Sequence, residues 1–301
     1  MNRTTSTKFG SGAIAVAAGL GSAALIVSLF GGESGNGRKP SPPPLTPVAQ
    51  QQQQEAPPPP FCGTPPLSDR QVKARPAPEF VVKGIDWLVK AQHPDGGWGA
   101  GSHANQAQID PHKVVVDPAT TAFVASALLR DGSTPVEGKH KANVRRATEY
   151  LCGVVEEYSA PGPKITDQSG TQIQAKLGPL VDTALTAQYF ARVLPTLPTS
   201  DALHARVDKS LDKCLAKLKE AQMKDGSWNV GGGWASVLQS SFGCSALEYA
   251  QAAGKQIDRE GLAKAREYNL GNFDVKSGAT KTEAAAGVTL YAFNSDVPDR
   301  S

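Results

Sequence analysis

Apolar and polar residues alternate along most of the chain with the period of an α-helix. Charged amphipathic segments, in which an apolar residue recurs every three or four positions, occupy 79–92, 141–158, 205–222 and 258–270. Segments with small residues on one side and aliphatic or aromatic residues on the other occupy 120–129, 182–194, 240–250 and 282–293. No segment shows the sustained two-residue period of a strand. We therefore predict an all-α domain of four hairpins, each a charged outer helix followed by an apolar inner helix.

A short motif occurs twice, each time at the end of an amphipathic segment and across an Asp-Gly turn. Its residues are Trp87, Gln92, Gly96 and Trp98 in the first copy and Gln222, Gly226 and Trp228 in the second. The second copy has Lys217 in place of the first Trp and Cys214 in place of Gly84. Such self-similarity indicates a repeat architecture, in which each unit buries its apolar face by stacking on its neighbours.

The first copy resembles the QW motif of squalene and oxidosqualene cyclases, which also occurs in degenerate form in protein prenyltransferase β-subunits. All seven defining positions are present, namely Lys83, Gly84, Trp87, Leu88, Gln92, Gly96 and Trp98. The resemblance covers 79–301 and implies an α/α toroid of paired inner and outer helices. It also implies that the motif is structural, so we assign Trp87, Trp98 and Trp228 to the repeat scaffold. The family's full ring has more helices than the eight predicted here, so we expect an incomplete or small toroid.

The resemblance implies two kinds of catalytic site, a general acid and a zinc ion. Squalene-hopene cyclases protonate their substrate with an Asp-x-Asp-Asp-Thr-Ala motif, and the nearest match here keeps Asp182 but has Val181 at the protonating position. Since a general acid must be titratable, the inherited acid site is missing. We interpret Asp182, and Asp117 before Pro118, as carboxylates at helix N-termini. They remain weak catalytic candidates.

Protein prenyltransferases hold zinc with an Asp, a Cys and a His, and this set has no matching arrangement in the chain. The local cluster of Asp110, His112 and Asp117 lies in a loop and contains no cysteine. We expect neither a metal nor another cofactor.

A cyclase pocket also needs aromatic side chains to stabilise carbocations. Once the motif tryptophans are set aside, the candidate ligand-binding residues are Phe123, Tyr189, Phe190, Trp234, Phe242 and Tyr291. Aromatic residues at helical spacing are equally typical of a core, and that alternative stays open.

The N-terminal third predicts an anchor and a spacer. Residues 13–30 are continuously apolar or small, and no charge occurs between Lys8 and Glu33. This length suits a transmembrane helix, and the basic residues before it place 1–12 in the cytoplasm and the rest outside, in the periplasm if the source is bacterial. A cleaved signal peptide is the alternative. Residues 31–78 hold more than half of the chain's 23 prolines and a run of glutamines, which predicts a disordered linker before the domain at 79–301.

The net charge limits the class of partner that we expect, and the cysteines limit the possible disulfides. A net charge of +3 spread over 301 residues gives no basic stripe, so we expect no nucleic-acid partner. Cys62, Cys152, Cys214 and Cys244 permit two disulfides outside the cytoplasm, with Cys214 and Cys244 on consecutive helices, or else serve as small buried hydrophobes.

We expect a membrane-anchored module that binds a hydrophobic or isoprenoid ligand or a protein partner. The alternatives are a divergent isoprenoid cyclase or prenyl-group enzyme, and a purely structural domain of an envelope assembly.

Overall fold

The computed structural model describes residues 77–102, 104–105, 107–228, 236–274 and 279–280. The predicted anchor, most of the predicted linker, the helix predicted at 282–293, Trp234 and Tyr291 lie outside these residues. Within the described part, the structure contains no helix that is both long enough and apolar enough to span a bilayer.

The described chain is all-α, as predicted. Its helices are α1 (Glu79–Lys90), α2 (Pro118–Arg130), α3 (Lys141–Glu157), α4 (Gln172–Leu177), α5 (Val181–Val193), α6 (Ala202–Ala221), α7 (Ser236–Ala252) and α8 (Arg259–Gly271), with short 3-10 turns at Pro111–Lys113 and Leu194–Thr196. A two-residue antiparallel ladder joins β1 (Phe273–Asp274) to β2 (Ala279–Thr280). All seven predicted helices that fall within the described residues are formed, each within a few residues of its predicted ends.

The short helix α4 was not predicted, because six residues are too few to show a periodic pattern. It forms behind a capping box. The hydroxyl of Thr171 accepts the backbone N–H of Gln174, and the Gln174 side chain accepts the backbone N–H of Thr171.

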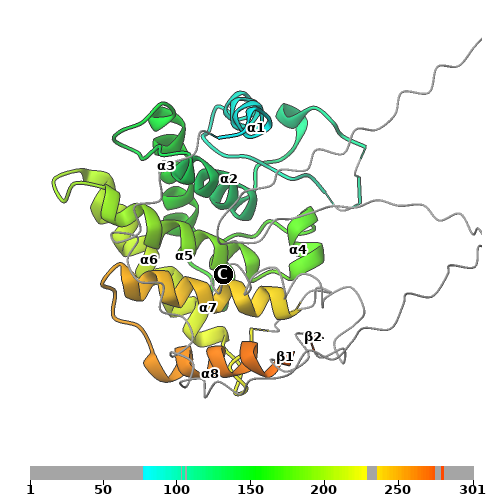
Figure 1. Cartoon of the computed structure of the whole chain (residues 1–301), viewed down its shortest axis with the longest axis vertical. Helices are drawn as coiled ribbons and strands as arrows, with labels where there is room; N and C mark the ends of the chain where they lie inside the picture. The colour runs from blue at the N-terminus through cyan, green and yellow to red at the C-terminus, as the bar shows by residue number, and fades with distance from the viewer. Residues whose placement is uncertain (1–76, 103, 106, 229–235, 275–278, 281–301) are drawn as a thin grey trace, which may run out of the picture.

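The long helices form two layers (Figure 1). The inner layer is α2, α5 and α7, with α5 packed between the other two. On the outer side α3 packs against α2, α6 against α5 and α8 against α7. Helix α1 stands at one end of this array and α8 at the other (Figure 1). The predicted alternation of outer and inner helices is thus confirmed for the described residues.

Composition explains why α5 takes the central place. All but two of its thirteen residues are buried, and a helix that is apolar on every side is stable only when other helices surround it. Small residues such as Ala184, Ala187 and Ala191 let its neighbours approach closely. The flanking helices α3 and α6 are amphipathic and cover it from the solvent.

The array contains the same three-helix arrangement twice. We call α1, α2 and α3 the first unit and α6, α7 and α8 the second unit. In each unit a motif-bearing helix is followed by an inner helix, and the inner helix packs on the next outer helix. Helices α4 and α5 connect the two units.

Candidate functional site

The glutamine of the first motif joins two helices. Its Nε2 donates to the carbonyl oxygens of Gly96 at 2.7 Å and Asn143 at 2.9 Å. Its Oε1 accepts from Asn143 Nδ2 at 2.7 Å and from Arg146 at 2.5 Å. Gln92 is buried, so all of its polar capacity is used to fix the end of α1 to the first turns of α3.

The second motif repeats this arrangement. Gln222 Nε2 donates to the carbonyl oxygens of Gly226 at 3.1 Å and Gly261 at 2.8 Å. Gly261 is the third residue of α8, as Asn143 is the third residue of α3. The two motifs therefore perform the same structural task in both units.

The motif tryptophans close the turn that follows. Trp98 Nε1 donates to the carbonyl oxygen of Leu88, and Trp228 Nε1 donates to that of Leu218, both at 2.8 Å. The backbone N–H of each Trp donates to an inner-helix hydroxyl, that of Thr121 or Ser240. Both indoles are buried, so they belong to the scaffold as predicted.

Trp87 does not share this role, and its assignment to the scaffold was wrong. Its side chain is largely exposed on α1. In the second unit the same position is Lys217, which is buried and donates through Nζ to the carbonyl oxygens of Ala160 and Gly162, each at 2.9 Å. The difference arises because α3 and its following loop cover α6, whereas no described helix takes that place beside α1.

Asp117 is the N-cap of α2, as predicted. Its Oδ1 accepts the backbone N–H of Thr120 at 2.7 Å, and its Oδ2 accepts that of Ala100 at 3.0 Å. The carboxylate is fully buried, and its burial raises its pKa.

Asp182 lies in the first turn of α5, but its carboxylate does not cap that helix. It reaches across to α2, where Oδ1 accepts the backbone N–H of Ala119 at 3.2 Å, and Oδ2 accepts from Gln174 Nε2 at 2.6 Å. Asp182 therefore lies at a helix N-terminus as predicted, but its carboxylate bonds to α2 and α4 and does not cap its own helix. The N-termini of α2 and α5 lie side by side, so the carboxylate of one inner helix can bond to the first turn of the other.

The two carboxyls form one electrostatic cluster, which we call the carboxyl pair. Burial raises the pKa of Asp182 to about 7, and the nearby Asp117 carboxylate contributes to the rise, against the hydrogen bonds from Gln174 and Ala119. Burial raises the pKa of the Tyr150 hydroxyl, and the nearby charges of Asp117 and Asp182 raise it further. Asp182 is therefore a carboxyl that exchanges a proton near neutral pH.

Of the four predicted aromatic ligand residues that the structure describes, three are buried and one is exposed. Tyr189 and Phe190 are fully buried, and the Tyr189 hydroxyl lies 2.6 Å from that of Thr148. Phe242 is buried in α7, while Phe123 is exposed on α2. Trp234 and Tyr291 lie outside the described residues.

The polar loop before α2 is held by its own hydrogen bonds. Asp110 Oδ1 accepts the backbone N–H of His112 at 3.1 Å, and His93 Nε2 lies 2.8 Å from the carbonyl oxygen of Pro111. Among the described residues, no group of three His, Cys, Asp or Glu side chains is arranged to hold a metal ion.

The described cysteines, Cys152, Cys214 and Cys244, are buried, and no two of them are joined in a disulfide. Burial raises the pKa of Cys152 and Cys214 to about 12, so both are unreactive as nucleophiles. Of the two alternatives, the structure shows the small buried hydrophobe and no disulfide between Cys214 and Cys244.

Large apolar side chains are exposed at the first end of the array, on α1 and α2. We call Phe80, Trp87 and Phe123 the end face. They are 51%, 55% and 41% exposed, whereas the residues at the equivalent positions of the second unit, Ser210, Lys217 and Phe242, are only 2%, 7% and 9% exposed. The second unit is covered at these positions by α3 and α5, whose own places have no described counterpart before the first unit.

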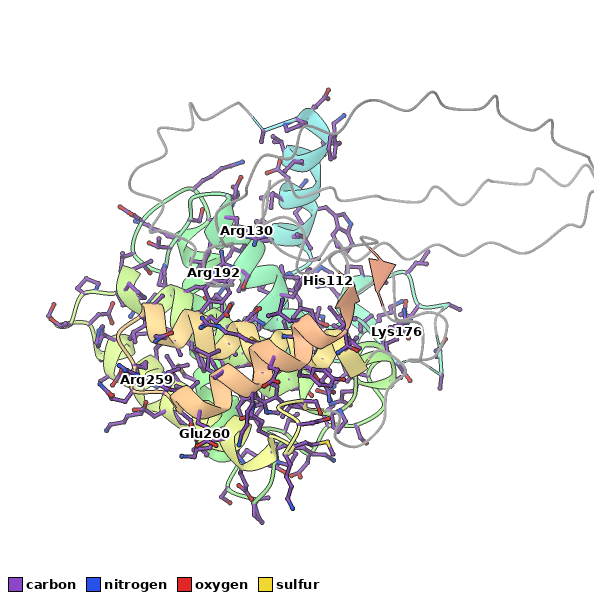
Figure 2. All side chains as sticks on the ribbon, turned by 60° about the horizontal axis from the view of Figure 1, so that its bottom comes forward. His112, Arg130, Lys176, Arg192, Arg259 and Glu260 are labelled. Atoms are coloured by element: carbon purple, nitrogen blue, oxygen red, sulfur yellow. The ribbon has the colours of Figure 1, made fainter. Side chains whose placement is uncertain are left out.

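The end face was not predicted, although the sequence contains one signal of it. Where the second motif has Lys217, the first has Trp87. Arg130 and Arg192 lie near each other at the C-terminal ends of α2 and α5 (Figure 2).

A comparison of the chain with models of known protein families finds no match, and no curated protein matches it.

Proposed function

We propose that the chain is a membrane-anchored, outward-facing helical-repeat module that binds a protein partner through its end face. In this proposal the two described layers are part of an incomplete α/α toroid of the squalene cyclase and prenyltransferase type. The segment at 13–30 anchors the chain, and the linker at 31–78 holds the module away from the bilayer. One observation carries the proposal. The second unit buries the positions that the first unit leaves open, and the first unit has aromatic residues there.

The chemistry-bearing residues support binding over catalysis. Gln92, Gln222 and Asp117 use their polar atoms to join helices and to cap them. The end face, in contrast, has large apolar side chains and no scaffold task. Exposed aromatic residues that cluster on one side of a soluble domain mark interaction sites.

The end face supplies part of the apolar surface that recognition of a partner needs. Each of its three aromatic side chains leaves roughly 100 Å² of surface in water. Burying that surface would contribute roughly 7 kcal/mol before the costs of association. These costs are large, so the expected affinity is moderate.

The second unit also indicates what kind of partner fits. There, the positions equivalent to the end face are covered by helices, α3 over α6 and α5 over α7. Gln188 of α5 even donates to the carbonyl oxygen of Phe242 at 2.8 Å. A partner that presents helices reproduces this packing, so a helical protein fits the end face better than an isoprenoid or other hydrophobic ligand.

Site-specific photocrosslinking tests the proposal. Benzoylphenylalanine replaces Trp87 or Phe123 in the full chain in its native membrane, and Lys209, exposed on the second unit, is the control site. We expect discrete protein adducts from the two end-face positions and none from the control. Adducts at all three positions, or at none, would reject the end face as a binding site. An adduct of lipid mass would favour a hydrophobic ligand instead.

A divergent isoprenoid cyclase or prenyl-group enzyme is the second candidate, favoured by the carboxyl pair. A pKa of about 7 suits a general acid at physiological pH. This candidate predicts that Asp182→Asn abolishes turnover of an isoprenoid substrate. The binding proposal predicts that the same variant keeps its crosslinked partner.

A further inference from the structure

Resting on the proposed end-face function, we propose that the partner of α1 is a second copy of this chain. The two copies pack α1 against α1 about a two-fold axis that passes near Gly84. The inference concerns one stripe of α1, made of Phe80, Gly84 and Trp87, which we call the α1 stripe.

The equivalent stripe in the second unit is already a helix-packing surface. It consists of Ser210, Cys214 and Lys217 on α6, all buried. Cys152 of α3 faces Ser210 and lies close to Cys214. Lys217 bonds to the loop that follows α3. This face of a motif-bearing helix is therefore built to receive another helix.

On α1 the same face has two large apolar side chains, whose exposure to water is unfavourable. The terminal units of repeat proteins usually present a polar outer side to water. Here Phe80 and Trp87 are instead more than half exposed, and no described helix covers them. At Gly84 a Cβ atom would meet nothing within 4 Å. The backbone is thus open between the two aromatic residues, and a second helix can approach it closely.

The stripe is complementary to itself. Phe80 lies four residues before Gly84 and Trp87 three residues after it, on one face of the helix. When two antiparallel α1 helices cross at Gly84, Phe80 of each copy meets Trp87 of the other. A two-fold contact makes each such pair twice, which is the usual geometry of a homodimer.

The charges beside the stripe do not oppose this contact. Lys83 is adjacent to the proposed axis, but its Nζ lies 2.7 Å from Glu79 of the same helix. Asp86, on the flank, lies 3.1 Å from Lys139. Each charge near the axis is therefore balanced within its own copy.

The area limits the strength of the dimer. Helix α1 has twelve residues, and the stripe offers roughly 200 to 300 Å² per copy, well below the roughly 800 Å² per partner of a stable complex. The expected dimer is weak and concentration-dependent, and Phe123 stays available to the rest of an interface.

Disulfide trapping in the full chain tests the inference. In a Cys62→Ser background, Gly84→Cys places a thiol at the axis, and Lys209→Cys on α6 is the control. Because a disulfide needs two Cα atoms within about 7 Å, we expect mild oxidation to yield a dimer with Gly84→Cys and none with Lys209→Cys. Adding Trp87→Lys, which introduces the residue of the second motif, should lower the dimer yield about tenfold.

The outcomes separate the two proposals. A discrete heteromeric photoadduct at Trp87 without a Gly84→Cys dimer would overturn self-association and keep the end face as a binding site. Equal trapping by Gly84→Cys and Lys209→Cys, or a yield that Trp87→Lys leaves unchanged, would also overturn it. If neither photoadduct nor dimer forms, both proposals fail. Circular dichroism and thermal unfolding of each variant establish that it is folded.

Discussion

At the scale of single residues, the surroundings of Asp182 explain its raised pKa. The side chain is buried at the junction of α2, α4 and α5, with one backbone N–H and one side-chain amide as donors. Two hydrogen bonds do not compensate a buried charge beside Asp117, so the neutral acid is favoured. Asp182 thus bonds to the first turn of α2 at a position where its own negative charge is unfavourable.

This arrangement predicts an unusual pH dependence of stability. The folded-state pKa of Asp182 is about 7, above the ordinary 3.8. Its contribution to the free energy of unfolding is therefore fully present below pH 4 and lost as the pH rises through 7, on the order of 4 kcal/mol in total. Asp182→Asn removes this loss, so urea denaturation at pH 4, 6 and 8 should give a flatter profile than the wild type.

Asp201 provides a control of opposite sign. Arg145, at 2.8 Å, lowers the pKa of Asp201 to about 2. Asp201→Asn should therefore lower stability by a constant amount between pH 4 and 8. If the free energy of unfolding of the wild type depends on pH between 4 and 8 in the same way as that of Asp182→Asn, burial does not raise the pKa of Asp182.

Gln92 makes a second prediction at this scale. In Gln92→Glu an oxygen replaces Nε2 and faces the carbonyl oxygens of Gly96 and Asn143, which lose their donor. We expect a loss of about 1 to 3 kcal/mol in the free energy of unfolding, measured by denaturant titration. Gln251→Glu, at an exposed position of α7, should change stability little. If the two variants behave alike, Gln92 does not tie α1 to α3.

At the scale of elements, the turn after each motif decides how closely two outer helices approach. Gly226 has a φ of +86°, and a Cβ there would lie 2.3 Å from the carbonyl oxygen of Lys264 in α8. Gly96 has the same relation to Arg146 in α3, at 2.4 Å. The glycine is therefore required by the neighbouring helix as well as by the turn.

A matched pair of variants separates these two requirements. Gly254 has a nearly identical φ of +83°, and a Cβ atom at that position would meet nothing within 4 Å. Gly254→Ala should cost about 1 kcal/mol from backbone conformation alone. Gly226→Ala should cost roughly 2 kcal/mol more, because α8 must move away. Thermal unfolding of both variants measures the difference, and equal costs would mean that α8 yields freely.

At the scale of the whole molecule, burial is distributed unevenly along the array. Helix α5 is surrounded on all sides, whereas only Ile85 is buried in α1. Local opening needs less free energy where fewer apolar contacts are broken. The end of the array that has the end face is therefore also its least stable part.

Hydrogen exchange followed by mass spectrometry checks this gradient. We expect the amides of α1 to exchange well before those of α5, with the Trp98 region intermediate because it is fixed to α2. Raising the protein concentration should slow exchange in α1 selectively if a second copy covers it. Lys209→Cys leaves the α1 surface intact and should not alter the pattern, whereas Trp87→Lys should remove the concentration effect.

The sequence by itself determined the helices and the repeat. Apolar residues at a spacing of three or four place one side of each outer helix in the core whatever lies beyond it, so α3 and α6 were predictable. The Gln and the Trp of the motif each bond to one backbone carbonyl nearby in the chain, Gln92 to Gly96 and Trp98 to Leu88, and this local part of their structural task was predictable.

Only the tertiary structure decided where long-range partners lie. Asp182 reaches α2 rather than its own helix, and Tyr189 and Phe190 are core residues, because both outcomes depend on how α5 is placed between α2 and α7. Trp87 and Lys217 occupy equivalent positions in local sequence, yet one is exposed and the other buried. The reason is that burial depends on which helix comes before a unit in space, and a local pattern carries no information about that neighbour.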